Sequence, residues 1–296
     1  MMTKTALRSM FPWMNTVDIQ AASFGRSGEG WFNGFALLSH LKQRAVHIGA
    51  TFVHGDAMRF DLSHSSGSSK HRIRRVAYCR AGSSRSGSSN DEEWLDSDWV
   101  INAGGPWAAQ VAALAKLEGV NCPVEAKRRV VHVVTSPLSL PKCPLVVDPS
   151  GMWFRGDGDN RFLVGSSPLE NEADPSNAPL GLTAEDQAAF EETLWPALAH
   201  RSPDCFNTLR LQRSWAGYYE VHPLDHNAII GPHGLLPNFV FCNGFSGHGL
   251  QHAFGVGRGL AEWIASGGTA YKTIDLTPLG CERVLAKRPF QETNVI

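Results

Sequence analysis

The chain has 296 residues, of which 43% are hydrophobic, and a formal net charge of −1. This length and composition predict an ordinary globular protein with one large domain or two interleaved ones. The near-zero net charge gives the whole molecule no electrostatic reason to bind nucleic acid. No run of about eighteen or more apolar residues occurs, so we expect no membrane-spanning helix and, at most, a peripheral membrane association.

The first third of the chain predicts a helix, a strand and an exposed hairpin. Apolar residues recur at helical spacing over residues 30–48, Gly49 is placed to end that helix, and residues 51–55 have the pattern of a strand. Two Ser/Gly-rich stretches then flank a basic, strand-like run over residues 71–80. We interpret residues 63–90 as a flexible hairpin insertion on the surface.

The middle of the chain predicts a strand, a glycine turn and a helix, followed by a sheet. Residues 98–102 are an apolar strand that runs into a glycine turn, and helical spacing returns over residues 107–117. Four short strands separated by Pro and Gly predict an antiparallel or mixed sheet, at residues 129–135, 145–147, 151–155 and 161–165. Thr183 and Asp186 then form a capping-box signature for a helix that extends to about His200.

The last third repeats the order of strand, glycine turn and helix. Residues 239–242 are an apolar strand, residues 243–249 are rich in glycine, and residues 250–264 have helical spacing. Free backbone amides and the helix dipole suit such a turn to electron-rich oxygens. The two glycine turns, at 103–107 and 243–249, could therefore converge on one crevice. The alternative for either turn alone is a tight structural turn.

Several other chemistries are disfavoured by spacing. Two groups have spacings that suit a metal: His222, Asp225 and His226 in a loop, and His248 with His252 at i and i+4 on a helix. No further ligand of matching spacing stands near either group. We therefore predict no metal site. Ser246 does not stand in the G-x-S-x-G elbow of a hydrolase. Gly255, Gly257 and Gly259 lie inside a helix and do not spell G-x-G-x-x-G, so they predict a packing face.

Several motifs together resemble the D-amino-acid-oxidase-like FAD oxidoreductases. In order along the chain they are NAGGPW (102–107), WAGYY (215–219), IIGP (229–232) and GFSGHGLQ (244–251). The resemblance covers nearly the whole chain. It implies an α/β fold with an incomplete three-layer FAD/NAD(P)-binding lobe at residues 1–122 and 206–296, and a substrate lobe with a mixed or antiparallel sheet at residues 123–205.

The same resemblance implies FAD as the cofactor and, by position, a set of contacts to it. Ala57 would lie near the adenine, the first glycine turn near the ribose and pyrophosphate, and the second glycine turn beside the isoalloxazine ring. The candidate contacts are Ala57, Ala103, Gly104, Gly105, Trp107, Gly244, Phe245, Ser246, Gly247, His248, Gly249, Leu250 and Gln251.

The chain also departs from the family pattern. The N-terminal G-x-G-x-x-G segment that binds the pyrophosphate does not precede Met1, so we expect a truncated chain that lacks a central parallel strand. Amino-acid oxidases of this family often carry an Arg where this chain has Tyr218-Tyr219-Glu220, which speaks against an amino-acid substrate. Tyr219 and His222 are the candidate catalytic or substrate-binding residues.

The narrower resemblance is to a mitochondrial factor for assembly of respiratory complex I. It implies a location on the matrix side of the inner membrane and, as partners, complex I subunits or assembly intermediates. Two alternatives stay open. One is an active flavin-dependent amine or amino-acid oxidase or dehydrogenase acting on a CH–NH bond, and the other is a cofactor-free interaction fragment.

Overall fold

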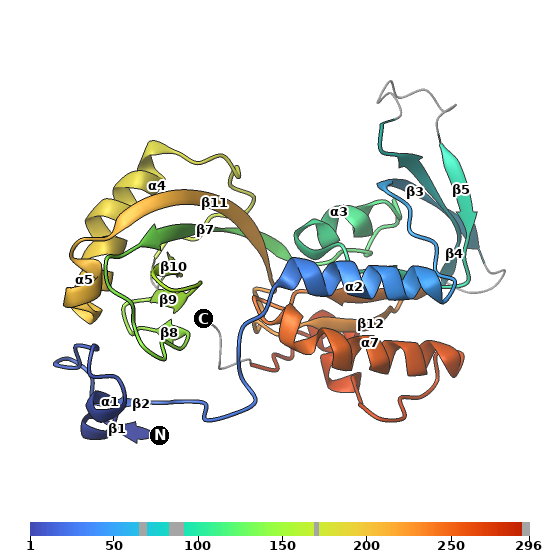
Figure 1. Cartoon of the computed structure of the whole chain (residues 1–296). Helices are drawn as coiled ribbons and strands as arrows, with labels where there is room; N and C mark the ends of the chain where they lie inside the picture. The colour runs from blue at the N-terminus through green and yellow to red at the C-terminus, as the bar shows by residue number, and fades with distance from the viewer. Residues whose placement is uncertain (65–69, 83–91, 169–171, 292–296) are drawn as a thin grey trace. The chain divides into compact units, whose positions relative to one another are not determined.

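The computed structural model describes residues 1–64, 70–82, 92–168 and 172–291 (Figure 1). These residues form two compact units. Unit 1 contains residues 1–38 and 128–218, and unit 2 contains residues 39–127 and the chain from 219 onward. Three elements run from one unit into the other: α2 (Gly34–His47), β7 (Glu125–Thr135) and β11 (Arg210–Val221).

Unit 1 is built on a five-stranded sheet in the order β11-β7-β10-β9-β8. Strands β7, β10, β9 and β8 pair antiparallel in that order, as the sequence predicted. The other elements of the unit are β1 (Met2–Thr3), α1 (Lys4–Met10), β2 (Ala21–Ala22), β8 (Val146–Val147), β9 (Met152–Gly156), β10 (Arg161–Ser166), α4 (Ala184–Ala189), the π-helix η3 (Phe190–Leu194), α5 (Trp195–Arg201) and α6 (Pro203–Phe206).

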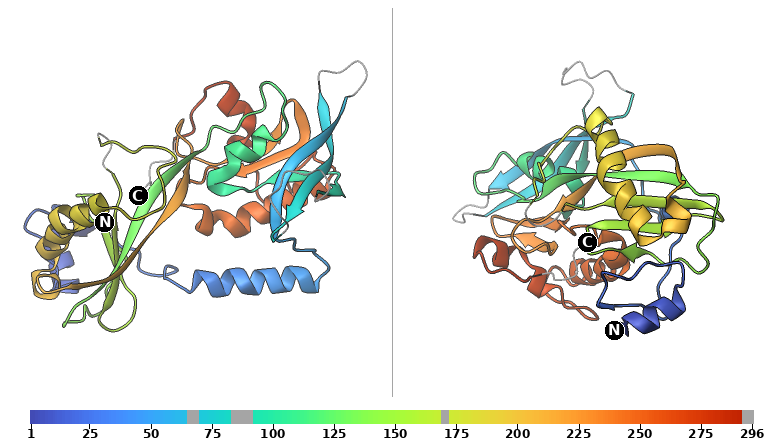
Figure 2. Two further views of the ribbon diagram at one scale, coloured as in Figure 1. Left: turned by 90° about the horizontal axis from the view of Figure 1, so that it is seen from above. Right: turned by 90° about the vertical axis from the view of Figure 1, so that its left-hand side faces the viewer.

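Helices α4 and α5 cover one face of this sheet (Figures 1 and 2). Phe190 and Leu198 on the helices pack with Phe154 and Phe162 on the strands in one buried cluster. Removal of this apolar area from water is what holds the layers together. The predicted capping box is confirmed, because the Thr183 side chain accepts the amide N–H of residue 186 and the carboxylate there accepts the Thr183 N–H.

The FAD-binding lobe was predicted to contain residues 1–122 and 206–296, but residues 1–38 and 206–218 belong to unit 1. The physical reason is a buried guanidinium. Arg201 donates to both carboxylate oxygens of Asp18, at 2.9 and 3.1 Å, and also to Asp148 and to the carbonyl oxygen of Asn15. These bonds attach the N-terminal segment to the helices and strands of unit 1.

Unit 2 contains two three-stranded sheets, ordered β12-β13-β6 and β3-β4-β5. Its elements, besides most of α2, are β3 (Gly55–His64), β4 (His71–Arg80), β5 (Glu93–Asp96), β6 (Val100–Asn102), the 3-10 turn η2 (Gly105–Trp107), α3 (Ala108–Ala113), β12 (Ile229–His233), β13 (Leu236–Asn243), α7 (Gly249–Ala265), the 3-10 turn η4 (Thr277–Leu279) and α8 (Cys281–Leu285).

Strand β13 is the centre of a layered arrangement, because its side chains alternate between two cores. Phe239 and Phe241 pack with Ala108 of α3 on one face, and Val240 packs with Leu260 of α7 on the other. Period-two alternation of this kind is what a strand covered on both faces requires. The fold class is therefore α/β, as predicted.

One predicted strand is absent from the structure. Residues 51–54 have no strand conformation, although the chain continues into β3 at Gly55. The carbonyl oxygen of His54 accepts the N–H of Ala81 at 2.9 Å, just after the end of β4, and no strand of the described residues pairs with residues 51–54. The α2 helix that precedes them has no buried residue. The helix predicted over residues 30–48 is confirmed as the shorter helix α2, Gly34–His47.

The basic hairpin prediction is confirmed for its central strand, because β4 coincides with residues 71–80. The Ser/Gly-rich parts of the predicted insertion, at 65–69 and 83–91, lie outside the described residues. None of the described helices is long and apolar enough to cross a membrane.

The two sheets of unit 2 are joined by one buried amide side chain. Asn238 accepts the N–H of Ile73 at 3.0 Å and donates to the carbonyl oxygens of Ile73 and Asp98 at 2.8 and 3.0 Å. Asn238 is fully buried. Ile73 is buried, so its two backbone groups would otherwise lack a partner, which is costly.

We expect Asn238→Ala to lower the free energy of unfolding by roughly 2–4 kcal/mol, because it leaves buried backbone groups of β4 unsatisfied. Urea unfolding followed by circular dichroism measures this change. The exposed Asn121→Ala is the matched control in the same unit. Equal stability of the two variants would contradict the assigned role of Asn238.

Candidate functional site

The two glycine turns lie side by side, as predicted, because β6 and β13 are neighbouring parallel strands. Asn102 at the end of β6 stands opposite Phe241, and the amide of Asn243 approaches the Asn102 Oδ1 atom at 3.5 Å. The same oxygen accepts the N–H of Gly104 at 3.0 Å. Both asparagines are buried. Asn102 and Asn243 therefore hold the starts of the two turns next to each other.

The first turn is open to a ligand. Gly105 has φ +54°, a conformation that glycine adopts without strain, and a Cβ there would meet no atom within 4 Å. Ala103 and Trp107 are exposed on either side of it. The turn continues through η2 into α3. A backbone of this shape can approach a ligand closely.

The second turn is held by Glu220 at the end of β11. Its carboxylate accepts the N–H of Gly244 at 3.0 Å and also the N–H of Phe245, while its carbonyl oxygen accepts the N–H of Ser246 at 2.9 Å. Burial raises the pKa of Glu220, and the two amide bonds to its carboxylate partly offset this. Sequence reasoning did not identify Glu220 as a turn-forming residue, because no spacing links it to the loop 24 residues later.

Gly244 and Gly247 are required by their surroundings. Gly244 has φ +78°, and a Cβ there would lie 3.1 Å from the Cβ of His222. Gly247 has φ +93°, and a Cβ there would lie 3.0 Å from the ring of Tyr219. The Tyr219 side chain, 38% exposed, therefore lies directly against the second turn. The structure thus brings this candidate residue to the predicted site.

Helix α7 begins at Gly249, where the second turn ends. His248 is the N-cap residue, and no side chain caps the helix through a hydrogen bond. Its Nδ1 atom is buried and without a hydrogen-bond partner in the described part of the chain. Leu250 and Gln251 follow as exposed residues of the first turn, beside Gly249. An uncapped N-terminus on a 17-residue helix is suited to negative charge.

His222 is placed behind the second turn. It is fully buried, its N–H donates to the Ser246 hydroxyl at 3.1 Å, and its Nδ1 lies 2.9 Å from both Asp225 Oδ1 and the carbonyl oxygen of Asn227. Two acceptors at Nδ1 place the proton on that nitrogen. Burial lowers the pKa of His222. This geometry favours a positioning role, and the predicted contact of His222 with substrate stays a prediction.

The remaining candidate lies on the other sheet. Ala57 is exposed on β3, opposite Tyr78 of β4. In the described part of the chain, no group of three or more His, Cys, Asp or Glu side chains is arranged to hold a metal ion.

The family model described as "FAD dependent oxidoreductase" (DAO) matches residues 1–263 of this chain. The chain belongs to the DAO family of FAD-dependent oxidoreductases. It is similar over its full length to "FAD-dependent oxidoreductase domain-containing protein 1" of Xenopus laevis, with 37% identity, and of Mus musculus, with 35%. The chain spans 60% and 62% of the length of these two relatives.

Among solved structures, the fold of this DAO-family chain is similar to that of L-proline dehydrogenase from P. horikoshii. The TM-score is 0.77 at 20% sequence identity, with 96% of this chain and 68% of that chain covered. The α/β fold with a second, sheet-based unit is therefore the fold of a DAO-type flavoenzyme.

FAD is the cofactor of the DAO family, and the second turn fits its flavin-ring side. The uncapped amides of α7 can face the electron-rich edge of the ring, the Nδ1 atom of His248 is a buried polar group without a partner, and Gly247 leaves space beside Tyr219. The pyrophosphate side is different. The 296 residues contain no G-x-G-x-x-G motif, and no strand pairs with the outer edge of β6 among the described residues.

The turn-holding carboxylate gives a pH-dependent prediction. Because burial raises the pKa of Glu220 in the folded state, the folded chain binds this proton more tightly than the unfolded chain does. Ionisation of Glu220 therefore costs stability, and the cost appears as pH rises from the ordinary value of 4.5 through the raised pKa. Relative to Glu220→Gln, we expect the wild-type chain to lose unfolding free energy over that range.

Chemical unfolding of both proteins at a series of pH values measures this difference. The side chain of Gln can still accept the Gly244 N–H, so the variant keeps the turn. The exposed Glu118→Gln controls for the loss of one carboxylate. A difference that stays constant, or that grows in favour of the wild type as pH rises, would show that Glu220 is not buried as described.

Proposed function

We propose that unit 2 forms the flavin-ring side of an FAD site in an oxidoreductase. The observation that carries this is the junction of two glycine turns at the ends of β6 and β13, next to the uncapped start of α7. In this proposal the contacts are those given by position, from Ala103 to Trp107 and from Gly244 to Gln251, with Ala57 toward the adenine. Unit 1 is then the substrate lobe.

The chemistry follows from the residues at the turns. FAD, when bound, accepts a hydride from substrate. The amides that begin α7 stabilise negative charge beside them, since they are preorganised and need not reorient. Glu220 fixes the shape of the turn, and His222 fixes Ser246. Tyr219 is the exposed side chain at the turn and the candidate for a substrate contact.

The substrate we propose is an amine, with a CH–NH bond as the site of oxidation. At the end of β11, where a carboxylate-binding Arg would stand, Glu220 is already engaged by the turn amides. The carboxylate of Glu220 would repel a substrate carboxylate placed beside it. This disfavours a simple amino acid and leaves the amine itself as the reacting group.

The outer edge of β6 supports the proposal that a further parallel strand completes the FAD site. An unpaired edge can pair with another strand. Beside it, Leu250 and Phe254 on α7 are 57% and 61% exposed, and Ile101 on β6 is 44% exposed. A strand-turn-helix with a G-x-G-x-x-G turn would pair with β6, cover these side chains and supply the pyrophosphate site.

The same surface favours a second candidate function, namely that of a cofactor-free interaction fragment. Exposed apolar side chains next to an open strand edge are typical of a surface that binds another protein. For the cell we propose a role in assembly or stability of mitochondrial respiratory complex I, on the matrix side of the inner membrane, with complex I subunits or assembly intermediates as partners. The support for this role is the resemblance of the sequence.

The flavin proposal predicts that Leu250→Glu weakens FAD binding about tenfold, because it places a carboxylate at the start of α7, where negative charge of the flavin would lie. The affinity is measured by quenching of flavin fluorescence, with the chain supplemented by a strand-turn-helix segment that carries a G-x-G-x-x-G turn. Leu285→Glu on α8, an equally exposed leucine, is the control. No flavin retention in any mixture would leave the interaction function as the better account.

The cellular proposal predicts that cells lacking the relative have less assembled complex I. The wild-type chain, joined to a strand-turn-helix segment that carries a G-x-G-x-x-G turn, should restore it. Native gels of mitochondrial membranes measure this. If Leu250→Glu restores complex I as well as the wild type does, the role does not need bound flavin. No restoration by the wild type would contradict the complex I role.

A further inference from the structure

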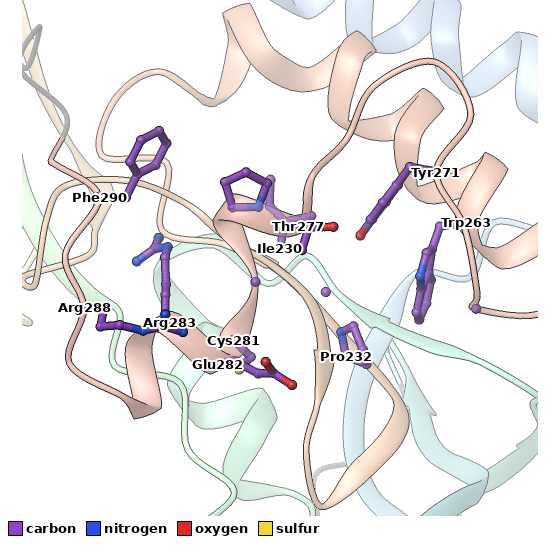
Figure 3. A pocket seen from close by; sticks show the side chains of 14 residues that line it. Ile230, Pro232, Trp263, Tyr271, Thr277, Cys281, Glu282, Arg283, Arg288 and Phe290 are labelled. Carbon is purple, nitrogen blue, oxygen red and sulfur yellow. The ribbon is translucent and has the colours of Figure 1, made fainter.

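Unit 2 contains a cavity of about 510 Å³ at the β12 edge of its sheet (Figure 3). Residues of β12, of the end of α7 and of α8 line it, with the chain between 268 and 290 completing the wall. None of the candidate flavin contacts lines this cavity. Its volume is in the range of small-molecule sites, which is roughly 300–1,000 Å³.

One side of the cavity is aromatic and apolar. The rings of Trp263 and Tyr271 stack with centroids 6.4 Å apart and an interplanar angle of 25°. Ile230 and Pro232 of β12 continue this wall. Trp263 is buried in the core between β13 and α7, so its ring position is fixed. A flat apolar group can pack against such a wall.

The other side is basic. In Figure 3, Arg283, Arg288 and Phe290 lie on the side away from Trp263 and Tyr271. Arg283 is only 6% exposed, and its Nε atom has no hydrogen-bond partner among the described residues. Burial lowers the pKa of Arg283, so its surroundings do not fully replace the water that it has lost.

The basic side is held rigidly. Asp225 accepts from Arg283 Nη1 at 2.6 Å and from the N–H of Phe290 at 2.8 Å. Arg283 Nη2 donates to the carbonyl oxygens of Asn227 and Ala228, at 3.0 and 2.6 Å. The side chain of Asn227 donates to the Phe290 carbonyl oxygen at 3.1 Å. The guanidinium and the C-terminal segment therefore keep their places without a ligand, as a preformed site requires.

We propose that this cavity binds a small aromatic carboxylate, with its ring against Trp263 and Tyr271 and its carboxylate toward Arg283 and Arg288. Arg283 is paired with Asp225, and Glu282 equals Arg288 in number, so the preference does not come from net charge. It comes from the Arg283 Nε donor, which has no acceptor among the described residues and therefore favours a ligand oxygen over a cation. The aromatic wall and the basic side lie apart, so a ligand needs both an apolar body and an anionic end. This inference does not depend on the flavin proposal.

The probe we choose is indole-3-acetate, with 3-methylindole as its neutral analogue and tryptamine as its cationic analogue. Isothermal titration calorimetry on the full chain should show saturable 1:1 binding of the carboxylate, about tenfold tighter than that of either analogue. Arg288→Gln should weaken the binding of indole-3-acetate to the level of 3-methylindole. Arg74→Gln, an exposed arginine on β4, should leave it unchanged.

Arg288 is exposed, so its substitution is expected to leave the fold intact, and circular dichroism checks this. Quenching of tryptophan fluorescence by benzoate, in the wild type and in Arg288→Gln, provides a second readout of the ring side. Absence of saturable binding up to millimolar indole-3-acetate would overturn the proposal. Equal binding of all three indoles, or equal loss in the Arg74 and Arg288 variants, would overturn it as well.

Discussion

The shape of the candidate site depends on one carboxylate. Glu220 receives the amides of Gly244 and Phe245, and its own carbonyl oxygen receives the amide of Ser246. These bonds satisfy the amides that begin the turn, while those that begin α7 keep no capping side chain. The turn amides are thus used by the protein's own structure, whereas Leu250 and Gln251 at the start of α7 are exposed. In the proposed function, the amides at the start of α7 are the ones that face the flavin.

The second constraint is the sheet around which unit 2 is built. β13 is covered on both faces and paired on both edges, whereas β6 has a partner on one edge among the described residues. Side chains are buried where β12, β13, α3 and α7 meet. In contrast, β6 is an edge strand of the described sheet, α2 has no buried residue, and the first residues of α7 are exposed. In the proposed function, a further parallel strand pairs with this edge of β6 and completes the FAD site.

One buried aspartate connects the turn to the cavity at the β12 edge. Asp225 contacts His222, which positions Ser246, and it also contacts Arg283, which lines the cavity. A buried acid shared by two basic groups is stable only while its partners stay in place. Asp225 therefore sets the geometry of the second turn and of the cavity wall together, although the two surfaces share no lining residue.

The sequence alone determined the elements that depend on local patterns. Helical spacing gave α7, alternation and turn residues gave the antiparallel sheet of unit 1, the capping box at Thr183 was confirmed, and the two glycine turns proved to be adjacent. These features are encoded within a few residues, or by the rule that neighbouring parallel strands end at one edge. The motifs also lie within a few residues each, so the sequence was sufficient to indicate the family and its cofactor, FAD.

Tertiary structure decided what depends on partners far apart in the chain. Residues 51–54 have a strand-like pattern, but no strand of the described residues pairs with them, so they are not a strand. Glu220 and His222 lie two residues apart, yet only packing shows that one holds the turn and the other is buried behind it. Arg201 draws the first 38 residues to unit 1 through Asp18, at a separation of 183 residues. A hydrogen bond or a buried charge depends on distance in space, which local sequence patterns do not encode.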